Sequence, residues 1–258
     1  MSIYSIIKVE FWKLLKKPLS YVMMATLFVP MFYTYSVLTD APLLQMTPSG
    51  ALDFAFGQWS LLGMTGLFQI LFSLVAVNTF SAELDKGQIQ MAVLRQCSRK
   101  KLVYAKGIVL VLYMVLCYAV YVVFSLLAYY SLIVRTPYGT GEFVSEVIKA
   151  YGMEKFILSG IFTLMDALVT AGIIFIFSLR YKTGTCFMLG IGISTLFLIM
   201  QFFPIVQYLV PAYVGSLLDY AMITPVTAVG LCVLYLAVAV VCVEITARKF
   251  RKMDIVKM

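Results

Sequence analysis

Few side chains in this sequence could carry out a chemical reaction. The 258 residues include no histidine, which removes the commonest general base and the commonest metal ligand. The five cysteines form no C-x-x-C pair. Asp166 is the only carboxylate well inside an apolar block, whereas an aspartyl dyad needs two. We therefore expect no catalytic residues and no metal site, and an enzyme embedded in the membrane remains only as an alternative.

Asp166 still needs an explanation. A charge inside an apolar block is costly, so this carboxyl should face protein or water, or be protonated. It could contact a cationic substrate or lie on a proton path, which makes it a candidate for a substrate pathway. The alternative is a hydrogen bond between helices with no further role. The sequence leaves both interpretations open.

The most informative polar segment runs from Phe80 to Gly107, between two apolar blocks. An acidic pair is followed by Lys86-Gly87, an apolar stretch of about two helical turns and a basic cluster. Ile89, Val93 and Leu94 fall on one side of that stretch. A short amphipathic helix of this kind could be gripped by a cytoplasmic partner. The simpler interpretation is a solvated loop whose charges only fix the topology.

The elements around this segment are apolar enough to lie in lipid. Hydrophobic residues make up 62% of the chain and charged residues 12%, with a mean hydropathy of +0.97. Backbone in lipid must satisfy its own hydrogen bonds, so spanning blocks should be helices. We therefore predict an all-α, polytopic membrane protein with six transmembrane helices. The predicted spans are Leu19–Leu38, Ser60–Phe80, Gly107–Leu132, Phe156–Leu179, Thr185–Phe203 and Met222–Val243.

The basic residues predict that both termini lie in the cytoplasm. With the N-terminus inside, 17 of the 20 lysines and arginines fall in cytoplasmic segments, and only Arg135, Lys149 and Lys155 fall outside. The opposite orientation would reverse that count. This distribution accounts for the net charge of +8, so we expect contact with membrane lipid and no nucleic-acid partner.

Residues 1–18 precede the first span and resemble an amphipathic interfacial helix. Their apolar side chains share one arc at helical spacing, although Glu10 and Lys17 interrupt it, and Pro18 marks a break. The alternative is a basic flank that only orients the first span. The arc consists of Ile3, Ile6, Ile7, Phe11, Leu14 and Leu15.

Three segments should lie on the outer side. Thr39–Trp59 contains prolines and glycines and is expected to be irregular. Ile133–Lys155 should hold a short amphipathic helix. Gln201–Thr224 is too apolar for a solvated loop and too broken for a span, so we predict a re-entrant pair of short helices. A hydrophobic loop resting on neighbouring helices is the alternative.

The segment between the second and third spans resembles that of permease subunits of type 2 ABC transporters. Those proteins have an N-terminal interfacial helix and six spans, and IKVEFWKLLKKPLSYV looks like the family's opening. This chain has Gln88 where the loop of those permeases usually has Thr, and Gln96 where it usually has Pro. The positions that match the pattern are Glu83, Gly87, Leu94, Ser98, Arg99 and Lys106.

The resemblance implies a multi-pass protein of the bacterial plasma membrane, with residues 19–258 as the transmembrane domain. Residues 81–106 would form the coupling loop, and residues 201–224 the re-entrant outer segment. Two ABC ATPase subunits and a second permease, either a copy or a paralogue, would be its partners. The chain has no G-x-x-x-x-G-K-[ST], so ATP and Mg would bind the separate ATPase and this chain would bind no cofactor. The expected ATPase-coupling residues are Glu83, Lys86, Gly87, Val93, Leu94, Ser98 and Arg99.

The expected function is export of an amphipathic or hydrophobic substrate. The small size and the lack of outer domains resemble the subgroup that clears lantibiotics and other antimicrobial peptides from the cell's own membrane. A secondary transporter or channel is an alternative, although we find no inverted repeats with matching broken helices. An immunity protein that works without ATP is another.

Overall fold

The computed structural model describes residues 2–39, 49–94, 98–146, 149, 152–219 and 222–253. Within these ranges the chain is helical, with no strand beyond an isolated bridge between Ser49 and Gly139. Six helical segments are long and apolar enough to cross a membrane, which confirms the predicted fold class and number of spans. They are Pro18–Leu38, Leu67–Asp85, Arg99–Arg135, Met153–Phe177, Thr183–Met200 and Pro225–Lys252.

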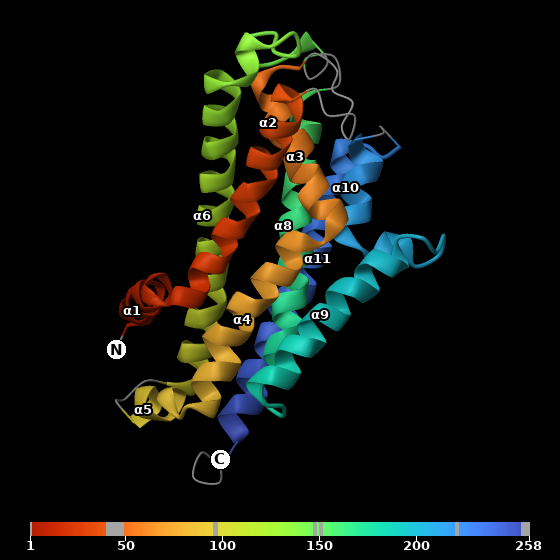
Figure 1. Ribbon diagram of the computed structural model, residues 1–258. Coiled ribbons are helices and arrows are strands. Elements are labelled where there is room, and N and C mark those ends of the chain that lie inside the picture. The colour runs from red at the N-terminus through yellow and green to blue at the C-terminus, as the bar shows by residue number, and fades with distance from the viewer. Residues whose placement is uncertain are drawn as a thin grey trace.

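The chain begins with a separate helix, α1 (Ile3–Lys16), which Ser2 caps by accepting a hydrogen bond from the Ser5 amide. Figure 1 shows α1 lying across the bundle rather than along it. The first span follows directly, as a 3-10 segment η1 (Pro18–Leu27) that continues into α2 (Phe28–Leu38). Since proline has no N–H, the ring at position 18 suits the first residue of this span.

The second span differs from its prediction. Gly66 adopts a left-handed conformation, with φ of 66°, and separates α3 (Ala51–Thr65) from α4 (Leu67–Asp85). The expectation that Thr39–Trp59 is irregular is wrong for its last nine residues, which form the start of α3. The Asp53 carboxylate accepts a hydrogen bond from the Gly50 amide and so caps this helix. Pro42 and Pro48 lie outside the described residues.

The remaining helices complete the bundle. A short helix, α5, joins α4 to α6, and the 3-10 turn η2 closes α6. Helices α4 and α8 are the most buried of the six spans. Helix α8 packs against α4, α10 and α11. The bounds are α5 Gln88–Leu94, α6 Arg99–Ser131, η2 Ile133–Arg135, α8 Met153–Phe177, α9 Thr183–Met200, η3 Gln207–Leu209, α10 Pro211–Asp219 and α11 Pro225–Lys252.

The two later outer segments are only partly described. Phe143 lies in a bend and is exposed, whereas Val147, Ile148 and Tyr151 of the expected amphipathic helix lie outside the described residues. The Gln201–Thr224 segment contains η3 and α10, two short helices. In Figure 1, α9 ends part-way along the bundle and α10 continues toward the end that holds η2. Its entry into the membrane remains a prediction.

Candidate functional site

The helix that was expected to couple the chain to a partner lies at one end of the bundle. Figure 1 shows α5 at the same end as the C-terminus. Helix α4 ends at Asp85, and Gly87, with φ of 68°, turns the chain into α5. The Gly87 amide donates to the Leu84 carbonyl, and its own carbonyl accepts from the Met91 amide. Glycine takes this left-handed conformation without a steric penalty, so the sharp turn depends on its identity.

Helix α5 uses one face inside the molecule and leaves another exposed. Ile89 is 1% exposed and belongs to the main core, and Val93 packs against the same cluster. Met91 is 57% exposed, and Lys86 just before the helix is exposed as well. Of the two expected contact residues on the apolar side, Val93 therefore faces the protein. The side chain of Leu94, the other expected contact residue, lies outside the described part of the structure.

Behind α5, a fully buried lysine joins three helices. Lys106 of α6 is 0% exposed, and its Nζ lies 2.5 Å from Glu10 Oε2 of α1 and 2.5 Å from Glu83 Oε2 of α4. The same ammonium donates to the Thr79 carbonyl at 3.0 Å. A buried ion needs partners of this kind, because its desolvation costs several kcal/mol. Helix α1 is thus attached to α4 and α6 through charge.

Two further lysines complete this arrangement. Lys13 and Lys17 approach Glu83 Oε1 at 2.7 and 2.6 Å, and Lys17 also donates to the Asn78 carbonyl at 3.2 Å. Burial lowers the pKa of Lys17 below its ordinary value, although its hydrogen bond with Glu83 opposes the shift. We call Glu10, Lys13, Lys17, Glu83 and Lys106 the ion cluster.

The end of α4 also holds the start of α9. Asp85 Oδ2 accepts hydrogen bonds from the Thr183 amide at 2.7 Å and from the Thr183 hydroxyl at 2.5 Å. Within a few residues, the end of α4 therefore contacts α1 and α6 through Glu83, α9 through Asp85, and α5 through Gly87. A displacement of α5 would act on all of these helices through one junction.

Arg99 and Ser98 start α6 on the other side of α5. The Arg99 guanidinium donates from Nη1 to the carbonyls of Arg251 and Met253, at 3.2 and 2.6 Å. It therefore satisfies carbonyls that the end of α11 leaves without helical partners. Ser98 is the N-cap residue of α6, but its side chain makes no capping hydrogen bond and is exposed. Arg99 links α6 to α11 instead of projecting freely toward a partner.

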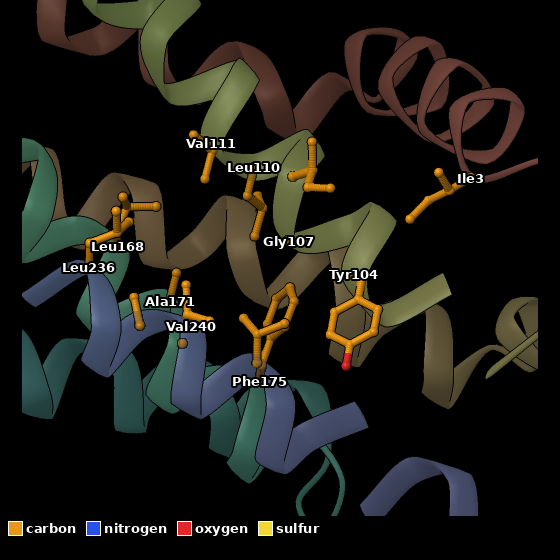
Figure 2. A pocket seen from close by; sticks show the side chains of 14 residues that line it. Ile3, Tyr104, Gly107, Leu110, Val111, Leu168, Ala171, Phe175, Leu236 and Val240 are labelled. Carbon is orange, nitrogen blue, oxygen red and sulfur yellow. The ribbon is translucent and has the colours of Figure 1, made fainter. Parts of the chain in front are cut away.

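An apolar groove of about 360 Å³ separates α6 from α11, with α8 at its floor. Figure 2 shows Gly107 and Val111 of α6, Ala171 and Phe175 of α8, and Val240 of α11 around it. Tyr104 lies at one end and hydrogen-bonds Glu244, which also pairs with Arg248 at 2.6 Å. The described lining carries no charged side chain, so the groove suits apolar groups such as lipid tails.

A family model described as a protein of unknown function, DUF2705, matches residues 19–256. This match covers nearly the whole chain. The chain belongs to the DUF2705 family. No curated protein matches it. Because the family match begins after α1, the matched part of this DUF2705 chain includes Glu83 and Lys106 but not Glu10.

The structure places Asp166 of the DUF2705 chain inside the bundle, away from the ion cluster. The residue lies on α8 and is 4% exposed, and its Oδ1 has no hydrogen-bond partner among the described residues. One turn further along α8, Thr170 accepts a hydrogen bond from Gln69 of α4 at 2.6 Å. The hydrogen bond between α4 and α8 at this level is therefore made by Thr170 and not by Asp166. A role of Asp166 in a substrate pathway remains a prediction.

Replacing Asp166 with Asn tests whether its charge contributes to the fold. Asn has nearly the same shape, and no hydrogen bond to Oδ1 would be lost. We expect Asp166→Asn to change the free energy of unfolding by less than about 1 kcal/mol, the typical value of one hydrogen bond. Unfolding in mixed micelles, compared with the conservative variant Asp166→Glu, provides the measurement. A large loss in the Asn variant would show that the carboxylate is a structural partner.

Sequence reasoning missed Glu10 as a functional residue and did not assign Lys106 a partner. Glu10 was visible only as an interruption of the apolar arc of α1, and Lys106 as a basic residue at the start of a span. Glu10 was a charge where an apolar residue was expected, whereas Lys106 stood where the resemblance places a lysine. Their separation of 96 residues kept the pairing out of reach of a local pattern.

Proposed function

We propose that this chain is the permease subunit of an ATP-driven ABC exporter that moves an amphipathic or hydrophobic substrate, such as an antimicrobial peptide, out of the membrane or cell. The observation that carries the proposal is the attachment of α5 to the end of α4, where Gly87, Glu83 and Asp85 connect it to neighbouring helices. The substrate class rests on the resemblance alone. The motor would be two separate ATPase subunits, and a second permease would complete the assembly.

The geometry supports a division of labour among the expected coupling residues. Lys86 is exposed and would contact the ATPase, together with Met91, an exposed residue of α5 that was not among the predicted coupling residues. Glu83 is buried in the ion cluster, so its contribution would be to transmit movement from α4 to α1 and α6. Arg99 would transmit it to α11. Closure of the ATPases on ATP would press on α5 and displace the ends of these helices together.

Glutamate at the exposed apolar position of α5 should disrupt the complex. Met91→Glu places a charge where the ATPase would bury an apolar side chain, and the desolvation cost should abolish co-purification with an ATP-binding cassette protein. The measurement is affinity purification of the full chain from its native membrane, followed by mass spectrometry of the bound proteins.

The matched control is Phe143→Glu, since Phe143 is also a large exposed apolar residue, 52% exposed, but lies between η2 and α8 beside the start of α3, away from α5. This variant carries the same new charge on a different surface and should retain the ATPase. If the unaltered chain captures no ATP-binding cassette protein, the exporter proposal is overturned. A secondary transporter, a channel or an ATP-independent immunity protein would then be favoured. Equal retention by both variants would show that α5 is not the contact.

A further inference from the structure

A polar cavity of about 270 Å³ lies beside the ion cluster, between the start of the first span and the end of α4. Its wall includes Lys17 before the span, Asn78 and Glu83 of α4, Lys86, and Gln88 of α5. The cavity is separate from the apolar groove between α6 and α11, with which it shares no lining residue.

The positive charges around this cavity outnumber the negative ones. The ion cluster contains three lysines and two glutamates, so one ammonium remains uncompensated. Lys86 adds a further positive charge and makes no ion pair within the part of the chain that the structure describes. Asp85, whose carboxylate accepts two hydrogen bonds from Thr183 of α9, adds one negative charge, so four lysines face three carboxylates and one positive charge remains in excess. Excess charge in a partly buried site is costly unless a counterion is bound.

We propose that this cavity binds the phosphate group of an anionic phospholipid. Lys17 and Lys86 would provide the positive charge, and the amides of Asn78 and Gln88 could donate hydrogen bonds to the phosphate oxygens. Basic cavities at the ends of membrane helices bind anionic headgroups through this chemistry.

The surroundings of the cavity favour a lipid over a soluble anion. Lys17 directly precedes Pro18, the first residue of a span, and the helix before it exposes apolar side chains at Tyr4, Val9 and Trp12. Exposed aromatic and aliphatic groups on a helix that lies across the bundle are typical of the headgroup level. A phosphate at this depth belongs to a lipid whose tails continue along the first span.

The bound headgroup would also touch the proposed coupling helix. Gln88 is the first residue of α5, and Lys86 precedes the Gly87 turn. Occupation of the cavity would fix this turn relative to α1 and α4. Anionic lipid would therefore stabilise one position of α5, a regulation that goes beyond the proposed export function and does not depend on it.

The test uses the full chain alone in mixed micelles, with phosphatidylglycerol added to a phosphatidylcholine background. Thermal unfolding as a function of phosphatidylglycerol gives an apparent affinity. Lys86→Gln should weaken it by about fivefold, the effect expected for one basic residue near an anionic surface. Lys101→Gln is the control, since Lys101 is exposed on α6, makes no ion pair among the described residues and loses the same charge. It should leave the affinity unchanged.

Two outcomes would overturn the proposal that the cavity binds a lipid headgroup. Lys86 lies outside the ion cluster, so its replacement should leave the fold intact, whereas Lys17→Gln would weaken both lipid binding and the cluster. Equal weakening by the Lys86 and Lys101 variants would overturn the site, because it would indicate general surface attraction. Inorganic phosphate that stabilises the chain as much as phosphatidylglycerol would overturn the assignment to lipid. Since no ATPase is present, these results are distinguishable from failure of the exporter proposal.

Discussion

Lys106→Met should lower the free energy of unfolding by about 3–5 kcal/mol, the usual cost of removing one partner from a buried ion pair. Methionine fills a similar volume, so the loss would come mainly from electrostatics. The substitution would leave Glu10 without its closest partner and would remove one of three lysines from Glu83. The Thr79 carbonyl would also lose a hydrogen bond.

Reversible unfolding in mixed micelles measures this loss, with Lys101→Met as the control. Both variants replace a lysine of α6 with the same side chain, but Lys101 is exposed and should contribute within about 0.5 kcal/mol, as surface positions generally do. Adding Glu10→Gln to Lys106→Met should recover part of the loss, because the unpaired charge is removed as well. Equal stability of the two single variants would contradict the placement of Lys106 in a buried cluster.

Trp59→Ala should have an effect of similar size, again about 3–5 kcal/mol, for a different reason. Trp59 of α3 is 2% exposed, and its ring centroid lies 4.9 Å from Phe68 of α4, 4.6 Å from Tyr118 and 5.0 Å from Tyr121 of α6. Its indole N–H donates to the Gly160 carbonyl of α8 at 3.2 Å. The substitution would therefore open a cavity where four helices meet.

Fluorescence can follow this site, because the chain contains only two tryptophans. A Trp12→Phe background leaves Trp59 as the only indole, and its emission should lie in the blue range typical of a buried ring. Trp12 is 56% exposed, so Trp12→Ala serves as the matched control and should cost little stability. An equal loss in the Trp12→Ala and Trp59→Ala variants would contradict the described packing of α3.

The number of spans could be predicted because hydropathy is a property of each segment by itself. The first and last spans begin close to their predicted positions for this reason, at Pro18 and Pro225. The break at Gly66 could not be predicted, since glycine within an apolar run is compatible with a continuous helix. The start of α3 was missed because its stability comes from packing against α6 and α8, which no local pattern records.

The local structure of the candidate site could be predicted from the sequence, but its contacts with distant residues could not. The turn at Gly87 and the short helix after it followed from composition, because a Lys-Gly pair before an apolar stretch is a local signal. The inward direction of Glu83 and Val93 did not follow, since a single helix cannot show which neighbours surround it. The contact of Arg99 with the carbonyls of α11 likewise depends on residues about 150 positions away.

The ion cluster has a consequence for synthesis of the chain. Glu10 leaves the ribosome 96 residues before Lys106. At roughly 5–20 residues per second, α1 must wait about 5–20 s for its buried partner. During that interval Glu10 lacks its buried partner, although Lys13 of α1 can already pair with Glu83 of α4 once that residue has been made. Glu10 can pair with Lys106 only after the third span has been inserted. The ion cluster is therefore completed late in membrane assembly.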